Sequence, residues 1–282
     1  MNAILVLARL TFHEALRRRI ALAALVLGLA FLTVYNVGLY FLFQEMVRET
    51  SLEPAGDLVL RNVLNFLFLA GLYGVNFLTL AMGALLSADT LAGEIGTGTI
   101  QALVTKPVAR AAIVLGKWLG FAGMLAIYLG LMAGGVTVSM WLQTGYAAPN
   151  LARGLGLIYL ASLLVMSVTL LSSSRFSALA TGGVVFGLYG LAFIGGWVEQ
   201  IGALLNNATA VNVGILSSLI TPSEALWRRA AYEMASPLAR AGGFVSPFSS
   251  TSIPSPLMVV YAGLYLLAAL GLAVRGFNRR DL

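Results

Sequence analysis

Long apolar stretches, each bounded by polar or basic residues, divide this chain into six segments of membrane-spanning length. The first, residues 20–43, would form a helix of roughly 36 Å at about 1.5 Å per residue, enough to cross a hydrocarbon core of about 30 Å. The other five segments are residues 63–86, 118–142, 154–171, 178–197 and 257–274. This pattern predicts an all-α, polytopic membrane protein with six transmembrane helices.

An amphipathic pattern precedes the first span, over residues 2–19. Polar positions recur at helical spacing on one side, and apolar positions lie near the opposite side. The two sets are Arg9, His13 and Arg17, and Ile4, Ala8, Phe12 and Ala15. We therefore expect a helix that lies in the headgroup region. His13, the only histidine, is interpreted as a polar-face residue, because a proton relay or metal site would need further partners.

The connection between the second and third spans, residues 87–117, concentrates charge that the spans lack. Glycines loosen the backbone after the acidic residues, a threonine can cap a short helix, and a Lys-Pro pair can end it. Apolar residues at i, i+3 and i+4 would share one face of that helix. In chain order, the residues concerned are Asp89, Glu94, Thr97, Thr99, Ile100, Leu103, Val104, Lys106, Pro107 and Arg110. Such a helix would either bind a partner or rest on lipid headgroups.

The least membrane-like stretch, residues 198–255, is expected to form a loop on the outer side, before the last span. The run Thr221-Pro222-Ser223-Glu224 predicts a capping box at the start of a helix that ends near Met234. Residues 202–220 are apolar but carry three asparagines, which favours an interfacial or partly inserted segment.

The expected helix after Pro222 carries two i,i+4 ion pairs, Glu224 with Arg228 and Arg229 with Glu233, which would contribute only about 0.2–0.5 kcal/mol each. Apolar side chains must therefore hold the helix in place. Leu226, Trp227 and Ala230 would do so by packing on the membrane interface or on a second copy of the chain.

Composition supports the membrane assignment, since 59% of the 282 residues are hydrophobic, 10% are charged and the mean hydropathy is +0.91. No cysteine is present, which excludes disulfides and thiolate metal sites. The net charge of +6 is better explained by sidedness than by nucleic-acid binding. With both termini and residues 87–117 in the cytoplasm, 11 basic residues lie inside and 6 outside, as the positive-inside rule favours in a cell (inner) membrane.

None of the six predicted spans contains Asp, Glu, Lys, Arg or His. This argues against a proton-coupled transporter, an intramembrane metalloprotease and a metal-dependent lipid transferase, which need ionisable groups at depth. Gly116-Lys117 does not belong to a nucleotide-binding loop, because Ala111 and Trp118 break that pattern. We therefore expect no catalytic residue and no metal ligand in this chain.

Polar groups within the membrane gather on the second span. Asn65 and Asn76 are about three helical turns apart and share a face, with Asn62 and Thr79 close to it. They form either an interhelical hydrogen-bond seam or a polar stripe along a substrate path.

Two spans carry glycines four residues apart. Gly183 and Gly187 lie on the fifth span, and Gly130 and Gly134 lie on the third. This spacing indicates close helix packing, with a dimer seam or a mobile gate as the alternative.

The residues of the central connection also carry a family resemblance. The pattern D-x-x-x-x-E-x-x-x-G-T-x-x-x-L-x-x-x-P-x-x-R, from Asp89 to Arg110 with Gly116-Lys117 following, resembles the cytoplasmic loop of ABC-2 type transporter permeases. Within that family, the chain looks most like the copper-enzyme-maturation permease branch. The N-terminal run TFHEALRRR, residues 11–19, is similar to the amphipathic segment common in that branch.

The resemblance implies a permease subunit of an ABC transporter, energised by a separate ATP-binding subunit that binds ATP and Mg and docks on residues 87–117. It also implies that the second and fifth spans line the substrate path and that the permease works as a dimer, a homodimer if the second copy is the same chain. A charge-free interior suits an amphipathic, lipid-like or drug-like molecule better than a bare ion, and we expect its movement to be outward. The alternative is a non-transporting membrane anchor or maturation factor that acts on a periplasmic client or accessory protein.

Overall fold

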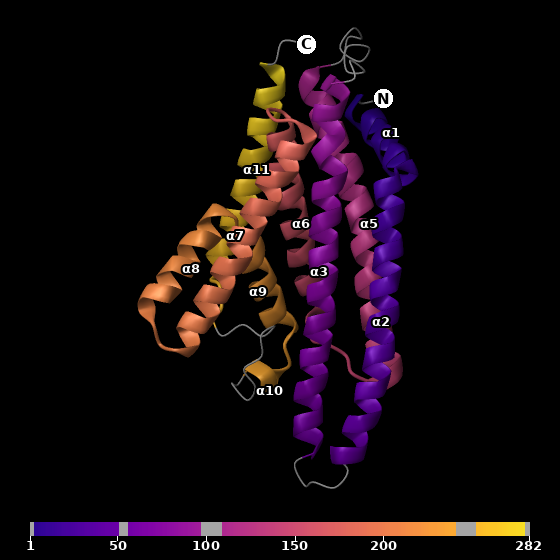
Figure 1. Cartoon of the computed structure of the whole chain (residues 1–282), viewed down its shortest axis with the longest axis vertical. Helices are drawn as coiled ribbons and strands as arrows, with labels where there is room; N and C mark the ends of the chain where they lie inside the picture. The colour runs from indigo at the N-terminus through magenta and orange to yellow at the C-terminus, as the bar shows by residue number, and fades with distance from the viewer. Residues whose placement is uncertain (1–2, 51–55, 97–108, 241–251, 280–282) are drawn as a thin grey trace.

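The computed structural model describes residues 3–50, 56–96, 109–240 and 252–279, and every regular element in these ranges is a helix. Six of the helices are long and apolar enough to cross a membrane, and each contains one of the apolar segments predicted above. They are α2 (Arg19–Thr50), α3 (Gly56–Gly96), α5 (Arg110–Thr144), α6 (Leu151–Ser173), α7 (Ala178–Leu204) and α11 (Pro256–Asn278) (Figure 1). The expected all-α, polytopic fold is confirmed.

The centre of the bundle is formed by α3, α5 and α6, whose apolar side chains make one continuous core. Within its most apolar stretch, α6 is 61% buried by the rest of the chain, whereas α2 is 11% buried. An apolar helix that its own chain leaves exposed on most sides must be covered by lipid or by another subunit. The helix α2 therefore lies at the periphery, as Figure 1 shows.

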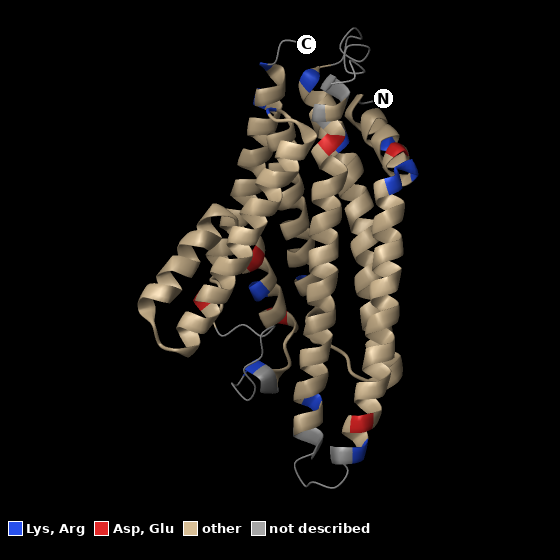
Figure 2. Ribbon diagram, viewed as in Figure 1, with Lys and Arg blue, Asp and Glu red and all other residues tan. Residues whose placement is uncertain are grey.

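One end of the bundle brings together both ends of the chain, the last turn of α3 and the first turn of α5 (Figure 1). There the Arg110 guanidinium donates a hydrogen bond to the backbone carbonyl of Asn278, with 3.2 Å between nitrogen and oxygen. Basic side chains gather at this end in Figure 2, and fewer lie at the opposite end, where α2 meets α3. This is the end that the positive-inside argument predicts to lie in the cytoplasm.

The N-terminal helix α1 (Ala3–Arg17) packs along the first turns of α5. Two glycines of α5 make this close approach possible, because a Cβ at Gly120 would lie 2.7 Å from the Ala8 carbonyl oxygen, and one at Gly116 would meet Leu7. The side of α1 that faces α5 includes Thr11 and Ala15, both buried. Gly116-Lys117, expected in a loop, therefore lies inside a helix.

The region predicted as an outer, helical loop before the last span is built mainly of packed helices. The helix α7 continues past residue 197 to Leu204, and α8 (Ala208–Ile220) folds back along it after a turn at Asn206, whose φ of 53° is left-handed. Small residues allow the two to approach closely, since a Cβ at Gly202 would lie 2.7 Å from the Ala210 Cβ. Two shorter helices follow, α9 (Ser223–Met234) and α10 (Pro237–Arg240).

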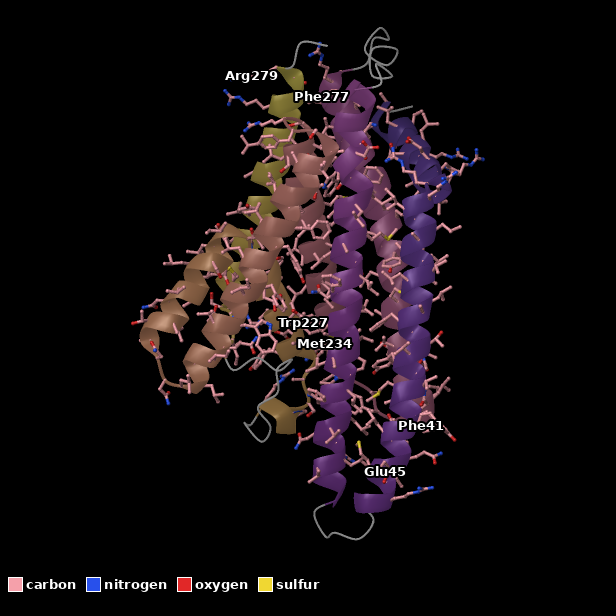
Figure 3. All side chains as sticks on the ribbon, in the orientation of Figure 1. Phe41, Glu45, Trp227, Met234, Phe277 and Arg279 are labelled. Atoms are coloured by element: carbon pink, nitrogen blue, oxygen red, sulfur yellow. The ribbon has the colours of Figure 1, made fainter. Side chains whose placement is uncertain are left out.

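The predicted helix after Pro222 exists as α9, but its surroundings differ from those expected. It packs against α6, α7, α11 and α3. Leu226, Trp227 and Ala230 are buried within the chain's own core rather than on the membrane interface or on a second copy. Figure 3 places Trp227 and Met234 between the level of Phe277 and Arg279 at one end and that of Phe41 and Glu45 at the other. The helix is thus an internal part of the bundle.

The capping box predicted at Thr221 was wrong. Pro222 is the N-cap of α9, which has no side-chain cap, and the Thr221 hydroxyl has no hydrogen-bond partner among the described residues. Thr221 instead ends α8 with an extended backbone, so the same residue serves as the joint between the two helices. The i,i+4 pair of Arg229 and Glu233 forms as predicted, at 2.7 Å.

The contact between α1 and α5 can be tested with two glycines of one helix. We expect Gly120→Leu to lower the thermal unfolding temperature in detergent and to expose α1 to proteolysis, because the new side chain would overlap the α1 backbone. Gly130→Leu is the matched control, since no described atom lies within 4 Å of its Cβ position and leucine is the better helix former by about 1 kcal/mol. Equal stability and equal proteolysis of the two variants would contradict this account.

Candidate functional site

The predicted partner-binding connection is described only at its two flanks. Asp89 is exposed on the last turns of α3, and Arg110 begins α5. The Glu94 side chain lies outside the described residues, as do Thr97, Thr99, Ile100, Leu103, Lys106 and Pro107. The short helix between the flanks therefore stays a prediction, while the flanks lie beside α1 and α11 at the same end of the bundle.

Two consecutive residues of α5 hold polar groups inside the bundle near this end. Lys117, expected in the solvated connection, is only 5% exposed. The next residue, Trp118, donates its indole N–H to the Ser167 hydroxyl of α6, at 2.9 Å. The first turns of α5 are therefore anchored by α1 on one side and by α6 on another.

The polar face predicted on α3 exists, and its members have different surroundings. Asn65 is buried and its side-chain oxygen accepts two hydrogen bonds, from the Tyr146 hydroxyl at 3.0 Å and from the Ser236 backbone N–H at 2.9 Å. It joins α3 to the connection after α5 and to the residues after α9, as a seam would. Thr79 is buried and donates to the Val75 carbonyl of its own helix.

Asn76 differs from Asn65 because it is 0% exposed and neither polar atom of its side chain has a hydrogen-bond partner among the described residues. Asn62 likewise has an oxygen with no described partner. A buried amide without partners costs roughly 1–3 kcal/mol in proteins. Asn76 therefore supplies hydrogen-bonding capacity that the described part of this chain does not use.

The glycines of the fifth span do not form a close contact within the described chain. Gly183 and Gly187 lie on an exposed side of α7, and no described atom comes within 4 Å of the position of a Cβ at either one. The same is true of Gly130 and Gly134 on α5. Close packing within one chain was therefore wrong for these pairs, and the dimer seam and the mobile gate stay open.

A buried ion pair links three of the helices in the region after residue 197. The Arg228 guanidinium of α9 lies 2.6 and 2.8 Å from the two carboxylate oxygens of Glu199 on α7. Arg228 also donates to the Ser218 hydroxyl of α8 at 3.1 Å, and Glu199 accepts from the Ser252 hydroxyl at 2.6 Å. The side chains of the pair are 2% and 4% exposed. The pair thus ties α7, α8, α9 and the segment before α11 together.

A second acid, Glu224, lies beside this pair on the first turn of α9 and is 2% exposed. Its side chain rests on the α7 backbone, where a Cβ at Gly196 would lie 2.6 Å from the Glu224 Cγ. Burial raises the pKa of the Glu224 carboxyl to about 7, although the Arg228 charge and the Tyr73 hydroxyl favour the ionised form. The buried carboxyl groups of Glu199 and Glu224 therefore share one nearby cation, the Arg228 guanidinium.

The expected charge-free interior was wrong. Glu199 and Lys117 lie within long apolar helices, and α9 brings Glu224 and Arg228 into the bundle. Figure 2 shows acidic and basic residues of α7 and α9 midway between the two ends. The sequence did hold one signal: the apolar segment 208–220, too short to span a membrane, separates Glu199 from Arg228. A helix folded back over that length brings opposite charges together.

The family described as ABC-2 family transporter protein matches residues 5–282, nearly the whole chain. The chain belongs to this family. It is thus a multi-pass membrane protein and a permease subunit of an ABC transporter, and permeases of this family generally work with an ABC ATP-binding subunit. A comparison with curated proteins gave no match.

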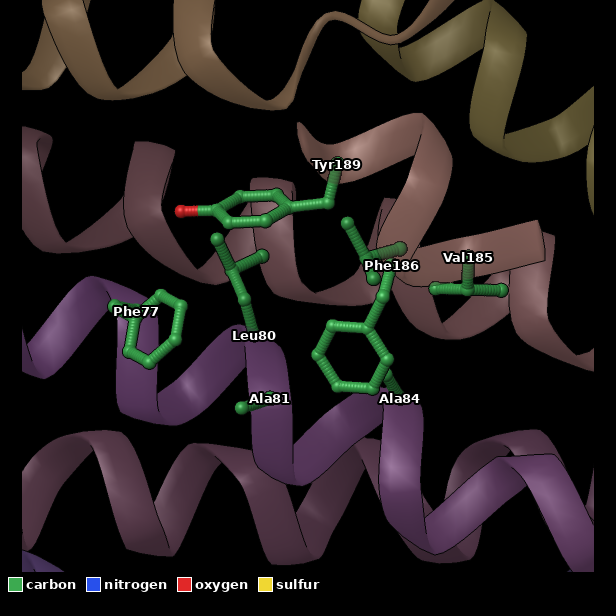
Figure 4. Close-up of a pocket in the computed structure, with 8 residues that line it drawn as sticks. Phe77, Leu80, Ala81, Ala84, Val185, Phe186 and Tyr189 are labelled. Atoms are coloured by element: carbon green, nitrogen blue, oxygen red, sulfur yellow. The ribbon is translucent and has the colours of Figure 1, made fainter. Parts of the chain in front are cut away.

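The ABC-2 permease has an apolar crevice between α3 and α7, shown in Figure 4. Phe77, Leu80 and Ala84 of α3 face Phe186 and Tyr189 of α7 across a space of only about 10 Å³. Ligand sites for drug-sized molecules usually measure about 300–1,000 Å³, so the crevice is closed to such a molecule in this conformation. Phe77 and Phe186 are 46% and 40% exposed, which places them at its open side.

The buried pair can be tested by removing one partner at a time. We expect Arg228→Met to lower the free energy of unfolding by about 3–5 kcal/mol, because Glu199 would stay buried without its counter-charge. The control is Arg229→Met on the same helix, whose partly exposed pair should contribute about 0–1 kcal/mol. Adding Glu199→Met to Arg228→Met should restore much of the loss. Denaturant unfolding in detergent measures all three, and equal losses in the two single variants would contradict a special role for Arg228.

Proposed function

We propose that this permease subunit moves an amphipathic, lipid-like or drug-like molecule outward across the cell (inner) membrane. A separate ATP-binding subunit, which binds ATP and Mg, supplies the energy and docks on residues 87–117. The family membership carries the proposal, because an ABC-2 permease contributes the membrane path and not the ATPase site. Both chain termini and the docking region face the cytoplasm in this proposal.

The arrangement at one end of the bundle supports the docking site. The flanks of residues 87–117 lie next to α1 and to the end of α11, and basic side chains gather around them. A motor that pulls on this region would act on the first turns of α5, which α1 and α6 hold on two sides. Movement of the first turns of α5 would therefore also move the helices packed on them.

The docking prediction is tested by co-purification with the ATP-binding subunit. Replacing Glu94 and Leu103 together by alanine should release that subunit without lowering the amount of permease in the membrane, because both residues lie in the predicted contact. Phe41→Ala with Glu45→Ala is the matched control, since Figure 3 places both residues at the opposite end. Undiminished recovery of the ATPase with the Glu94 and Leu103 variant would count against the coupling role.

The substrate path is proposed to run between α3 and α7. The apolar crevice of Figure 4 supports this, as does Asn76, which lies one residue before Phe77 on α3 and has no described hydrogen-bond partner. An amphipathic molecule offers apolar surface to the crevice and polar atoms to the amide. In this conformation the path is narrow, and opening it requires α3 and α7 to separate.

Substitutions of two asparagines of α3 can distinguish a structural role from a role in the substrate path. We expect Asn65→Leu to lower the unfolding temperature, because the partly buried Ser236 N–H would lose its acceptor at a cost of up to about 1–3 kcal/mol. Asn76→Leu should keep or raise that temperature but weaken substrate-stimulated ATP hydrolysis by the reconstituted pair. Loss of stability in Asn76→Leu with unchanged stimulation would assign Asn76 to the fold instead.

A second copy of the chain is proposed to complete the transporter as a homodimer. The exposed glycine side of α7, with Gly183 and Gly187, supports a helix contact between copies, since it makes no close contact within the described chain. The peripheral helix α2 offers further apolar surface.

The second candidate function is a membrane anchor or maturation factor for a periplasmic client, as the copper-enzyme-maturation branch suggests. A cleft at the end opposite the termini favours it, with about 750 Å³ between Leu64 of α3, Tyr146 and Pro237. Stimulation of ATP hydrolysis separates the two candidates: amphipathic molecules should stimulate an exporter, and a periplasmic accessory protein should stimulate a maturation factor.

A further inference from the structure

The three buried charges in the region after residue 197 do not balance. Glu199 has both carboxylate oxygens engaged by Arg228 and one also by Ser252. Glu224 has no comparable partner, because one of its oxygens finds no hydrogen-bond donor among the described residues. With both acids ionised, the cluster carries one net negative charge inside an apolar bundle. Burial of an unbalanced charge costs several kcal/mol, and uptake of a proton removes that cost.

The groups around Glu224 come from the helices packed on it. Tyr73 of α3 and Tyr189 of α7 lie close enough to interact with its carboxyl, Glu199 lies on α7 behind Arg228, and Arg228 is the nearby cation. The first turn of α9 adds the positive end of a helix dipole. Arg228, Tyr73 and the dipole favour the carboxylate, whereas burial opposes it and outweighs them, so that the pKa of Glu224 rises to about 7.

The space beside these groups limits what the site can hold. A small cavity bounded by Tyr189, Thr221 and valines of α6 and α7 has room for about one water molecule. The Glu224 side chain itself lies against the α7 backbone at Gly196. An organic cation or a hydrated metal ion does not fit there without separating the helices. A proton does.

We propose that Glu224 is a proton-binding site within the bundle, and that its proton sets how firmly α9 holds to α3 and α7. In the protonated form the carboxyl is neutral, Arg228 belongs to Glu199 alone, and the first turn of α9 rests on Gly196 and Tyr73. In the ionised form Glu224 competes with Glu199 for Arg228 and leaves one uncompensated charge. Loss of the proton therefore loosens α9 from the helices that border the crevice. This goes beyond transport, because the site titrates whether or not substrate or ATPase is bound.

The sign of the effect on stability follows from the raised pKa. Because the folded state binds this proton more tightly than the unfolded chain, the stabilisation is fully present below the ordinary pKa of about 4.5 and is lost as pH rises through about 7. Glu224→Gln mimics the neutral carboxyl at every pH. Its unfolding temperature should therefore match that of the wild type near pH 5 and exceed it increasingly above pH 7.

The experiment compares thermal unfolding of the purified full-length chain in detergent from about pH 5 to about pH 9. The readout is the difference between wild type and Glu224→Gln, which cancels other titrating groups, and Glu233→Gln on the same helix is the control whose difference should not change between pH 6 and 8. Parallel profiles for Glu224→Gln and wild type would overturn the proposal.

Infrared spectroscopy of the wild-type chain supplies a second readout that does not depend on a variant that folds. The carbonyl band of a protonated carboxylic acid should persist at pH 6, where exposed acids are ionised, and should disappear as pH rises through about 7. Where Glu224→Gln folds, it should lack the band. A wild-type chain with no such band at pH 6 would also overturn the proposal.

Discussion

Polar groups inside this bundle must find partners within the protein, because the surrounding hydrocarbon offers none. The pair of Glu199 and Arg228 meets much of this requirement for two full charges, with Ser218 and Ser252 supplying further hydrogen bonds. The folded-back helix α8 and the internal helix α9 both depend on it, since each contributes a residue to the same cluster. A buried ion pair adds little net stability over an apolar contact, but it fixes which helices meet and in what register.

Hydrophobic length alone was enough to predict the six long helices, because a membrane imposes a minimum run of apolar residues that few other structures need. Hydrophobic length did not predict that α7 continues past residue 197 to Leu204. The asparagines around residue 206 favoured an interfacial or partly inserted segment, and no local pattern shows that Glu199 would be neutralised by Arg228, 29 residues away. Long-range pairing of charges is a property of the fold, which a local pattern does not contain.

The polar face of α3 illustrates the same limit at a finer scale. Helical periodicity placed Asn65 and Asn76 on one side, but it did not distinguish them. Asn65 meets a hydroxyl and a backbone N–H from two other segments, whereas Asn76, three turns further along, meets no described donor or acceptor. Glycine spacing was equally ambiguous: the predicted pairs on α5 and α7 lie open, and the close approach occurs at Gly120 and at Gly116, which a family motif had assigned to a loop. Whether another helix packs on a given glycine depends on where the fold places that helix, which the spacing of glycines does not show.

The packing of α1 against α5 also requires an order of events during biosynthesis. Residues 3–17 leave the ribosome before α5, yet the groove that receives them is formed by glycines about 100 positions downstream. Until the third span has been inserted, the buried side of α1 has no protein surface to cover it, and the nascent chain must hold that helix at the lipid headgroups. Helix α1 is thus synthesised before α5 but reaches its final place only after α5 has been inserted.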